Sequence, residues 1–487
     1  MSNNQGQKFY ITTTLPYVNA EPHIGHAMEF VRADVIARYK KVLGYDVFFN
    51  TGTDEHGTKI LEGATKEGLD VQVYVDRNAA RFKELFSTLG ITHDVHFIRT
   101  TDEKHVNATQ EMWRRCNDNG YIYKKEYEAK YCVGCELYKT DSELFEGKCE
   151  IHPNREIEII KEENYFFAFS KLEKKLLELY EKNPLLVVPD FRFNEIKSFV
   201  TRGLVDFSIS RLKSKMSWGV PVPHDDDHVM YVWFDALTSY ISTLGWPADG
   251  GDFSYWKEGT PVQYCGKDNL RQQSAIWQAM LLAADLPNTS HIIIDGFIIS
   301  DGQKMSKSIG NVINPFDVID LFKEVTDFPE DVLRFVLLHE VPSFEDGDIT
   351  VESIKGAYSA HLANGIGNLT SRIMKMATVN LTEGVRPELY AFPDEYREAL
   401  AHFDSKKALE FVMKEAGLLD GYIQSTEPFK VIKVDAEKGE ALILEMRTRL
   451  YNIARLLQPF LPRTSDAIKR CIHNHIMPER SLFNRLP

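Results

Sequence analysis

Phe9-Tyr-Ile-Thr-Thr-Thr14 is followed by Leu15-Pro-Tyr-Val-Asn-Ala-Glu-Pro22 and then by His23-Ile-Gly-His26. The first segment is aromatic and β-branched, which favours a strand, and the second is rich in residues that form turns. Apolar residues then recur at helical spacing from 27 to 43, and Asp46-Val-Phe-Phe-Asn50 predicts a second strand. A strand, a helix and a strand in this order predict a βαβ unit with a parallel sheet, and so an α/β fold.

The rest of the chain adds an insertion and a helical region. From about 121 to 188, charged strand-like pieces such as Glu156-Ile-Glu-Ile-Ile-Lys161 indicate an insertion into the sheet domain. Further strands are predicted at 229–234 and 291–294, with a helix between them at 274–284. Beyond about 351 we expect a helical bundle whose clearest helices, together with the start of the last one, lie at 354–379, 405–424, 436–457 and Thr464-Ser-Asp466.

Composition places limits on the class of protein. The 487 residues suggest two to four domains, and the 43% apolar and 26% charged fractions are ordinary for a globular protein. The net charge of −14 argues against broad non-specific affinity for nucleic acid. No transmembrane run is found, and the polar start does not resemble a signal peptide. Six cysteines, three of them clustered, favour a reducing, cytoplasmic location over a disulfide framework.

Cys132-Val-Gly-Cys135 and Cys149-Glu-Ile-His152 have the spacing of metal ligands. Two tight pairs supply three thiolates and one imidazole, which suit a closed tetrahedral zinc ion. Because no ligand position is left vacant, we predict one structural Zn²⁺ held by Cys132, Cys135, Cys149 and His152.

His23-Ile-Gly-His26 stands at the predicted start of the first helix, where free backbone N–H groups favour anions. Gly25 lacks a Cβ and would let a nucleotide approach the backbone, and the two imidazoles share one face of the first turn. They can donate hydrogen bonds to phosphate oxygens as charge builds up in a transition state. The simpler interpretation is a pair of surface or capping histidines.

Lys304-Met-Ser-Lys-Ser308 lies between Gly302 and Gly310, which suggests a mobile loop with hinges at its ends. Two lysines three residues apart can reach one polyphosphate from the same side. An exposed basic loop without a ligand is the alternative.

In this order, the two segments resemble the paired signatures of the class I aminoacyl-tRNA synthetases, and nearly the whole chain resembles the methionyl-tRNA synthetase family. The resemblance implies a Rossmann-like catalytic domain that joins methionine to AMP and then transfers it to the 3′-terminal adenosine of tRNA(Met). It implies catalytic roles for His23, His26, Lys304 and Lys307, with ATP accompanied by Mg²⁺ and also bound by Gly25, Gly266 and Asp268.

The resemblance implies other site residues as well. Methionine would be bound by Leu15, Tyr17, Asp54, Trp233, Ala236, Tyr240 and Gln273, and the anticodon by Asn368, Arg372 and Phe429. Three positions depart from the family's usual residues. Gln273 stands where many relatives have His, Asn269 where an aliphatic residue is usual, and Phe429 where most have Trp. Gln cannot carry charge, and Phe lacks the indole donor although it can still stack on a base.

The domain boundaries follow from these assignments. The insertion of about 70 residues leaves no room for the large editing domain of synthetases for isoleucine, valine or leucine. The C-terminal tRNA-binding and dimerisation domain of some relatives is not expected, so we expect a monomer. The predicted parts are 1–117 and 196–300 for the catalytic domain, 118–195 for the insertion, 301–353 for the KMSKS loop and stem-contact region, and 354–487 for the anticodon-binding bundle.

Three alternatives remain at the level of sequence. The departures at Gln273 and Asn269 leave open a synthetase of the same class for another amino acid. A cofactor-forming nucleotidyltransferase shares an HxGH signature, but the insertion and the bundle argue against it. A non-catalytic RNA-binding relative would bind tRNA without activating any amino acid, and the intact signatures argue against it.

Overall fold

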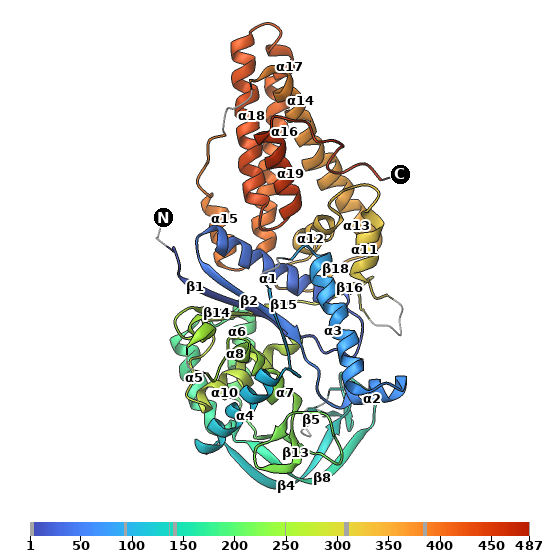
Figure 1. The fold of residues 1–487 in the computed structure, drawn as a ribbon, viewed down its shortest axis with the longest axis vertical. Coiled ribbons are helices and arrows are strands. Elements are labelled where there is room, and N and C mark those ends of the chain that lie inside the picture. Colours follow the sequence, from blue (N-terminus) through green and yellow to red (C-terminus); the bar gives the residue numbers. More distant parts are fainter. Residues whose placement is uncertain are drawn as a thin grey trace.

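The structure is a computed structural model that describes residues 4–91, 95–135, 137–139, 144–248, 250–305, 311–382 and 387–486. Figure 1 shows two parts, a body built on a parallel sheet and a column of helices that stands on one side of it. The column contains the C-terminal third of the chain, as predicted. None of the helices in the described ranges is long and apolar enough to cross a membrane.

A six-stranded sheet forms the centre of the body, and all its neighbouring strands are parallel. Its order is β3 (Val95–Arg99), β2 (Asp46–Thr53), β1 (Lys8–Thr13), β14 (Thr260–Gly266), β15 (His291–Asp295) and β9 (Val187–Val188). Phe9 and Ile11 of β1 enter one hydrophobic core, and Tyr10 between them enters another. Both faces of the sheet are therefore buried, which explains why β1 is apolar at successive positions. The predicted α/β class is confirmed.

The strand order reverses between β1 and β14. From β1 the chain moves outward to β2 and β3, whereas from β14 it moves the other way to β15. Ligands of open parallel sheets bind in the crevice at such a switch point, beyond the carboxyl ends of the strands. The segments that leave β1 and β14 are 14–23 and 267–269, so the fold itself directs attention to them.

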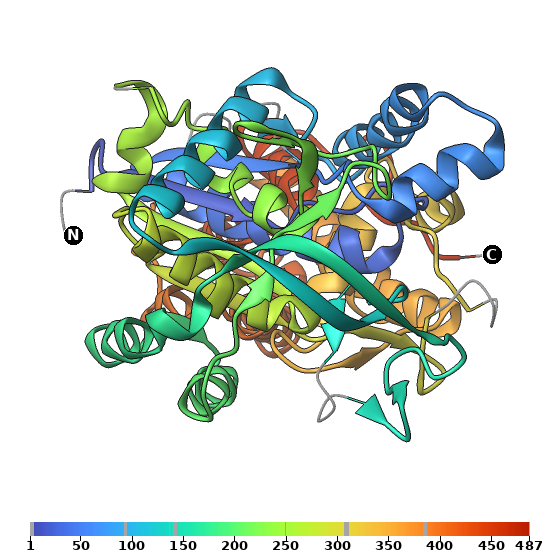
Figure 2. The same ribbon diagram turned by 90° about the horizontal axis from the view of Figure 1, so that it is seen from below.

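The insertion is a second, antiparallel sheet that crosses the underside of the body, as the teal strands of Figure 2 show. Its strand order is β10 (Phe207–Ser208), β8 (Ile157–Phe167), β4 (Ile122–Cys132) and β5 (Leu137–Lys139). A two-stranded hairpin near its end contains β6 (Leu144–Phe145) and β7 (Lys148–Cys149). The smaller elements that follow are η2 (Phe169–Leu172), α5 (Glu173–Lys182), α6 (Asp190–Thr201), β11 (Ser210–Leu212), β12 (Pro221–Val222) and β13 (Asp225–Met230).

The strand predicted at 229–234 is wrong in its second half. β13 ends at Met230, and Val232–Ala236 is the short helix α7. Tyr231 is the N-cap of α7, its backbone N–H donates to Ile209 O, and the helical turn buries Phe234 and Asp235 together. A run of apolar residues cannot by itself distinguish a buried strand from a buried helical turn. Further along this half lie α8 (Ser239–Ser242), η3 (Gly251–Phe253), α9 (Ser254–Lys257), η4 (Lys267–Asn269), the π-helical η5 (Gln272–Trp277) and α10 (Gln278–Ala283).

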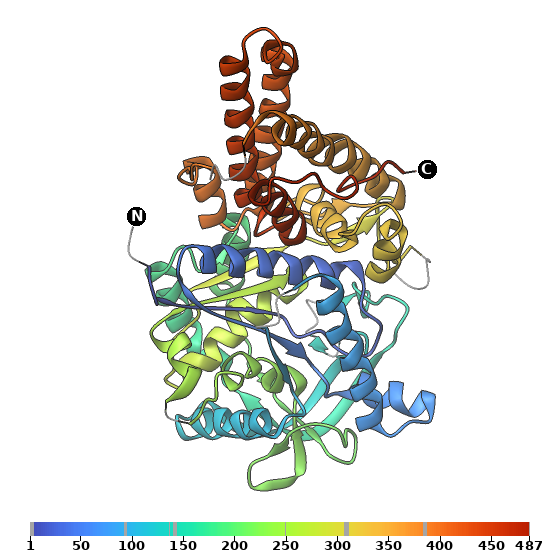
Figure 3. The same cartoon turned by 45° about the horizontal axis from the view of Figure 1, so that its top comes forward.

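The helix α1 (Ile24–Val42) lies between the sheet and the helical column, as Figure 3 shows. Its Arg32 pairs with Asp295 at the end of β15 at 3.0 Å, and its Asp34 pairs with Arg334 at 2.7 Å, with all four side chains buried. The other helices beside the first strands are α2 (Thr58–Glu67), α3 (Val71–Thr88) and α4 (Glu103–Asp118).

A small sheet and a series of helices lead from the body into the column. The small sheet contains β16 (Ile298–Ser300), β17 (Gln303–Lys304) and β18 (Gly347–Asp348). The helices are α11 (Pro315–Phe322), α12 (Pro329–His339), α13 (Val351–Ala357), the π-helical η6 (Tyr358–Gly367), α14 (Asn368–Asn380), α15 (Asp394–Ala401), α16 (Ser405–Thr426), α17 (Pro428–Val431), α18 (Ala436–Leu457) and α19 (Pro462–His473).

The last helix begins earlier than predicted. Pro462 occupies the first turn of α19, so Thr464 is inside the helix and is not its N-cap. The carboxylate of Asp331 on α12 accepts hydrogen bonds from the backbone N–H and the hydroxyl of Thr464, at 2.6 and 2.7 Å. The cap of this helix is therefore supplied by a distant residue, which a local capping pattern cannot reveal.

Candidate functional site

The two histidines of the first motif stack at the start of α1. His23 is the N-cap, and its Nδ1 accepts from the Gly25 N–H at 3.1 Å, while Nδ1 of His26 accepts from the His23 N–H at 3.2 Å. Their ring centroids are 3.8 Å apart. Burial lowers the pKa of His26 well below its ordinary value, and His23 adds to the shift, so this ring is neutral near pH 7. A neutral imidazole that accepts at Nδ1 carries its proton at Nε2, which leaves a donor for a ligand.

Gly25 also has a role within the helix itself, apart from nucleotide binding. A Cβ at this position would lie 3.0 Å from two atoms of the His23 imidazole. The glycine therefore makes room for the ring that caps its own helix.

Glu29, one turn after His26, connects α1 to the segment that leaves β1. Its carboxylate accepts from the backbone N–H and the hydroxyl of Thr14, each at 2.6 Å. Burial raises the pKa of Glu29 to about 8, against the effect of those bonds, and the nearby carboxylates of Asp295 and Asp268 also raise it. Glu29 and Asp268 thus lie close enough to interact, which brings the start of α1 and the turn after β14 to one place.

The turn after β14 is shaped around Asp268. A Cβ on Gly266 would meet Oδ1 of Asp268 at 2.8 Å, so the glycine lets this carboxylate fold back over the backbone. The neighbouring Lys267 pairs with Asp346 at 2.7 Å, and Asp346 also accepts from the Phe297 N–H at 2.9 Å. The exposed Asp268 is therefore held at the carboxyl edge of the sheet by its neighbours on both sides.

The lysine loop begins as a hairpin. β17 pairs with β16 through Ile299 and Lys304, and the turn between them contains Asp301 and Gly302, both with positive φ. The Gly302 N–H donates to Asp348 at 2.8 Å, which fixes the turn. For Lys304 the structure gives the backbone position, and Lys307 lies outside the described residues.

Asp54 and Tyr17 lie side by side where the segment after β1 meets the end of β2. Their backbones form a bridge, with the Asp54 N–H donating to Pro16 O at 2.9 Å and the Val18 N–H to Asp54 O at 3.2 Å. The side chain of Asp54 is buried, and Tyr17 is partly buried. Leu15, in the same segment, is also partly buried and packs against the core on the other face of the sheet.

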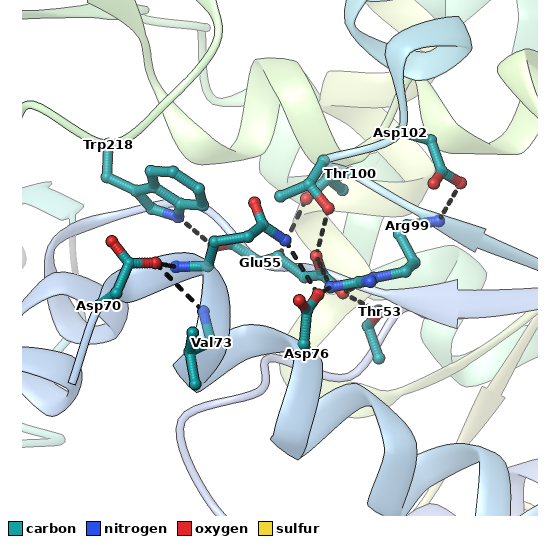
Figure 4. Close-up of polar contacts among 11 residues, drawn as sticks. Thr53, Glu55, Asp70, Val73, Asp76, Arg99, Thr100, Asp102 and Trp218 are labelled. Carbon is teal, nitrogen blue, oxygen red and sulfur yellow. Dashed lines mark hydrogen bonds and ion pairs between the residues drawn. The ribbon is translucent and has the colours of Figure 1, made fainter. Parts of the chain in front are cut away.

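Glu55, the residue after Asp54, is held by a set of hydrogen bonds that Figure 4 shows. Its buried carboxylate receives two bonds from Arg99, at 2.7 and 2.9 Å, and others from the hydroxyls of Thr53 and Thr101 at 2.6 and 2.5 Å. Its carbonyl oxygen accepts from the Trp218 indole at 2.6 Å. Arg99 also reaches Asp76 on α3 at 2.6 Å. The backbone that carries Asp54 is therefore fixed immediately beyond it.

Trp233 and Ala236 are presented by α7, whose position depends on Asp235. Asp235 is fully buried and accepts from Nδ1 of His56 at 2.6 Å and from Nε2 of His105 at 2.7 Å. Burial opposes its ionisation, but the two imidazoles outweigh that effect and lower the pKa of Asp235 to about 2. A buried carboxylate between two histidines ties α7 to the segment of Asp54 and to α4.

Tyr240 and Gln273 form the end of a chain of hydrogen bonds in which each side chain donates to the next. Gln278 donates to Thr289 at 2.9 Å, Thr289 donates to Gln263 at 2.6 Å, and Gln263 donates to Gln273 at 2.8 Å. Gln273 in turn donates to the Tyr240 hydroxyl at 2.6 Å. Since that hydroxyl already accepts a bond, its own proton is left to point elsewhere. Gln263 thus fixes the amide of Gln273.

The cysteine cluster converges as its spacing predicts. Cys135 Sγ lies 3.3 Å from Cys149 Sγ and 3.2 Å from Nδ1 of His152, and all four ligand atoms, including that of Cys132, lie within 4.8 Å of one another. Three thiols and one imidazole at these separations fit a tetrahedral zinc ion. A Cβ on Gly134 would lie 2.3 Å from the His152 ring, so the motif needs glycine there. All six cysteines of the chain are free of disulfides.

Lys59 links the cysteine cluster to the candidate site. Lys59 on α2 donates to the Gly134 carbonyl at 3.0 Å, and its ammonium lies 6.0 Å from the ring of Tyr17. The metal-binding turn is therefore fastened beside the segment that carries Asp54 and Tyr17.

The three residues expected to contact an anticodon lie on the helical column. Asn368 is exposed at the start of α14, and Arg372 one turn later forms an ion pair with Asp420 on α16. Phe429 is 45% exposed on α17, which follows directly after the end of α16 that carries Asp420. Arg372 and Phe429 are thus placed at the same end of the column.

Sequence reasoning missed the residues that support the site. They are Glu29, Glu55, Arg99, His56, His105, Asp235 and Gln263. Only Val232-Trp-Phe-Asp-Ala236 carried a signal, because a charged residue inside an apolar run is buried only when it is paired, and Asp235 is such a residue.

Comparisons with known proteins agree with this arrangement. A sequence model of the family "tRNA synthetases class I (M)" matches residues 9–156 and 141–374. Methionine–tRNA ligase of Brucella suis biovar 1 is 37% identical over 483 residues, which cover 95% of this chain and 91% of the relative. Methionine–tRNA ligase of Thermotoga maritima is also 37% identical, over 97% of this chain and 76% of the relative.

Solved structures give the same result. The methionyl-tRNA synthetase of Mycobacterium tuberculosis in complex with methionyl-adenylate superposes with a TM-score of 0.86 at 33% identity, over 98% of both chains. Its apo form superposes with a TM-score of 0.82 at 29% identity, over the whole of both chains. Sequence, fold and the order of the motifs therefore agree, and this chain belongs to the methionyl-tRNA synthetases of class I, the methionine–tRNA ligases.

Proposed function

We propose that methionine and ATP meet at the carboxyl ends of β1 and β14. The observation that carries this proposal is the stacked pair His23 and His26, placed at the strand-order switch and brought near Asp268 through Glu29. The related Mycobacterium tuberculosis enzyme is described as a complex with methionyl-adenylate, the intermediate that this site would make.

The reaction needs no protein nucleophile. A carboxylate oxygen of methionine attacks the α-phosphorus of ATP, the bond to the β-phosphate breaks, and pyrophosphate leaves with the electron pair. The Nε2–H groups of His23 and His26 donate to phosphate oxygens as negative charge builds on them, and Lys304 and Lys307 neutralise the leaving pyrophosphate. Gly25, Gly266 and Asp268 hold the nucleotide, with the Asp268 carboxylate suited to the ribose hydroxyls. Mg²⁺ accompanying ATP would neutralise part of the phosphate charge.

Methionine is held at both ends. Asp54, kept in place by the Glu55 bonds, binds the α-ammonium group by charge-assisted hydrogen bonding. Leu15, Tyr17, Trp233, Ala236, Tyr240 and Gln273 enclose the side chain. The transfer step follows when a ribose hydroxyl of the terminal adenosine of tRNA(Met) attacks the methionyl carbonyl and AMP leaves. Six cysteines without a disulfide, three of them in a cluster suited to zinc, favour a reducing cytoplasm as the place of this reaction.

The two steps can be separated in one experiment. Purified protein is mixed with ATP and labelled methionine without tRNA, passed through a desalting column, and then mixed with tRNA(Met). We expect about one equivalent of methionyl-adenylate to remain with the protein and to be discharged onto the tRNA. Adenylate that forms only with another amino acid, or that is never transferred, would contradict the proposal.

Arg99→Lys tests the support of Asp54. The substitution keeps the charge but cannot form the two-pronged contact with Glu55, so the loop that carries Asp54 loosens. We expect the KM for methionine in ATP–pyrophosphate exchange to rise about tenfold, which corresponds to ~1.4 kcal/mol, while the KM for ATP changes little. Arg77→Lys, at an exposed ion pair with Glu67, is the matched control and is expected to behave as wild type. An equal rise in both KM values would argue against this role.

Gln263→Met tests the hydrogen-bond chain. Methionine fills a similar volume but leaves Gln273 without its donor, so its amide can rotate away from Tyr240. We expect a KM for methionine raised about tenfold and a stability lower by ~1–3 kcal/mol. Gln110→Met, on the exposed side of α4, is the control. If the KM for methionine is unchanged while stability is lost, Gln263 has only a structural role.

We also propose that the helical column recognises the anticodon through Asn368, Arg372 and Phe429. The exposed ring of Phe429 is suited to stack on an unpaired base, and the Arg372 guanidinium can bind a base edge or a phosphate. Arg372 would exchange its partner Asp420 for the RNA.

Phe429→Ala tests this part alone. Loss of one stacking platform should cost ~1–3 kcal/mol, or roughly 5- to 150-fold in kcat/KM for tRNA(Met). Exchange without tRNA should be unaffected, and Phe429→Trp should restore charging. Leu418→Ala, another exposed apolar residue of the column, serves as the control. Wild-type charging by Phe429→Ala would exclude this ring from the tRNA interface.

A further inference from the structure

A second cluster of metal-binding side chains lies where α12 meets η6. His339 is the last residue of α12, Glu340 is its C-cap, and His361 lies in the π-helical turn of η6. One ligand atom of each lies within 4.8 Å of the others. None of the three belongs to the adenylation site or to the cysteine cluster.

The side chains are held in orientation by aromatic packing. The rings of His339 and His361 have centroids 4.7 Å apart. Phe335, one turn earlier on α12, stacks on His339 at 4.7 Å and also contacts His361 at 5.6 Å. The carboxylate of Glu340 accepts from Nδ1 of His339 at 2.7 Å. The cluster is thus preorganised on two rigid elements.

The location favours a cation. The carboxyl end of a helix carries partial negative charge, and Glu340 adds a carboxylate there. Lys406 is already bonded to the carbonyls of His339 and Glu340, so these carbonyls are not available and the ion would be held by the three side chains. The side chains of His339 and Glu340 are 15% and 32% exposed, so an ion can reach them from solvent.

The donor set selects the kind of ion. Two imidazoles and one carboxylate suit zinc and its neighbours among the divalent transition metals, whereas calcium and magnesium prefer oxygen ligands. Ligands at 2.0–2.2 Å from one zinc ion lie roughly 3–3.5 Å apart, so small side-chain movements within the 4.8 Å cluster suffice. Three ligands leave at least one position for water, which makes this site weaker than a closed Cys₃His site.

We propose that His339, Glu340 and His361 bind a divalent transition-metal cation such as Zn²⁺ and so tie the end of α12 to η6. α12 packs against α1 of the catalytic body, and η6 continues into α14 of the column. The bound ion is therefore a cross-link between the two parts of the molecule.

The test uses the whole protein with its cysteine cluster already filled with zinc. Co²⁺ is titrated into this protein and followed by calorimetry and visible absorption. We expect one further equivalent to bind, with the weak visible bands of nitrogen and oxygen ligands and without the intense thiolate-to-cobalt band of a cysteine site. Zinc in excess should displace it and raise the thermal midpoint.

Three variants identify the ligands. His361→Gln and Glu340→Gln should each weaken Co²⁺ binding by at least ~10-fold and abolish the zinc-dependent rise in the thermal midpoint. His402→Gln, an exposed histidine of the same region, should bind as wild type. If either substitution impairs folding, as judged by circular dichroism, the Co²⁺ affinity of the other variant tests the ligand assignment. The proposal fails if the zinc-filled wild type binds no further equivalent, or if a folded variant binds Co²⁺ as tightly as wild type. Methionine activation is measured in a separate assay. The metal-binding result does not depend on it, so failure of one proposal can be distinguished from failure of the other.

Discussion

His26→Ala is expected to reduce methionine-dependent ATP–pyrophosphate exchange by about 10²–10³-fold, the typical cost of removing one donor to a developing oxyanion. His26 is neutral near pH 7, accepts the His23 N–H at Nδ1 and therefore offers Nε2–H to the phosphate. The loss should fall mainly on kcat, because the bond strengthens as charge builds on the α-phosphate. Steady-state exchange over a range of ATP and methionine concentrations measures it.

Two further variants make this result specific. His26→Gln retains a side-chain N–H donor and should recover part of the lost rate, whereas His402→Ala should behave as wild type. If His26→Ala is folded and keeps kcat within threefold of wild type, His26 takes no part in the chemistry.

The protonation of His26 also predicts how stability depends on pH. Its folded pKa is lowered by burial, so below about pH 6.5, the ordinary value of histidine, the unfolded chain binds a proton that the folded chain does not. The protonation of His26 therefore makes no difference to the free energy of unfolding above pH 6.5, and it lowers that free energy as the pH falls below this value. Denaturation of wild type and His26→Ala between pH 5 and 8 should show a smaller acid loss in the variant.

Cys149→Ser is the second large effect that we expect. Serine is a poor ligand at neutral pH, and structural zinc sites contribute about 10–16 kcal/mol to the folding of the segment that binds them. The variant should retain no zinc after dialysis against a chelator, whereas wild type retains about one equivalent. Because Gly134 is bonded to Lys59 near Tyr17, the KM for methionine should also rise.

Cys471→Ser is the control, because this thiol is buried in the helical column and belongs to no cluster. It should keep the zinc and the wild-type KM. Metal analysis of the dialysed proteins decides the matter: zinc retained by Cys149→Ser at the wild-type level would refute the ligand assignment.

The elements that formed a repeating local pattern could be predicted from the sequence. The helix after His23 and the long helices of the column were recognised because their apolar spacing matches the helical period. The strand from Phe9 was recognised from its aromatic and β-branched composition. The turn at Tyr231 and the Asp331 cap of α19 were missed because tertiary contacts fix them. The π-helical segments η5 and η6 also lie inside runs that read as ordinary helix.

The residues of the candidate site also fall into two groups, those that the sequence predicts and those that it does not. His23, His26 and the cysteine cluster lie in short motifs whose chemistry can be predicted from the residues themselves, whereas Asp54 was predicted only from the resemblance to a known family. Gln263 could not be recognised, because its relation to Gln273 and Tyr240 exists only after β14, η5 and α8 have packed together. Glu29 carries no motif of its own in the sequence, and its bonds to Thr14 exist only after α1 has packed on the end of β1.

Amino-acid-dependent ATP–pyrophosphate exchange tests the central claim most directly, because it reports adenylation at the sheet edge without tRNA. Purified wild-type protein is assayed with methionine, leucine, isoleucine and cysteine over the same concentration range. We expect methionine to exceed each of the others in kcat/KM by at least ~10²-fold, as an enclosed pocket with fixed polar groups can provide. Exchange with methionine no faster than with leucine or cysteine would contradict the account.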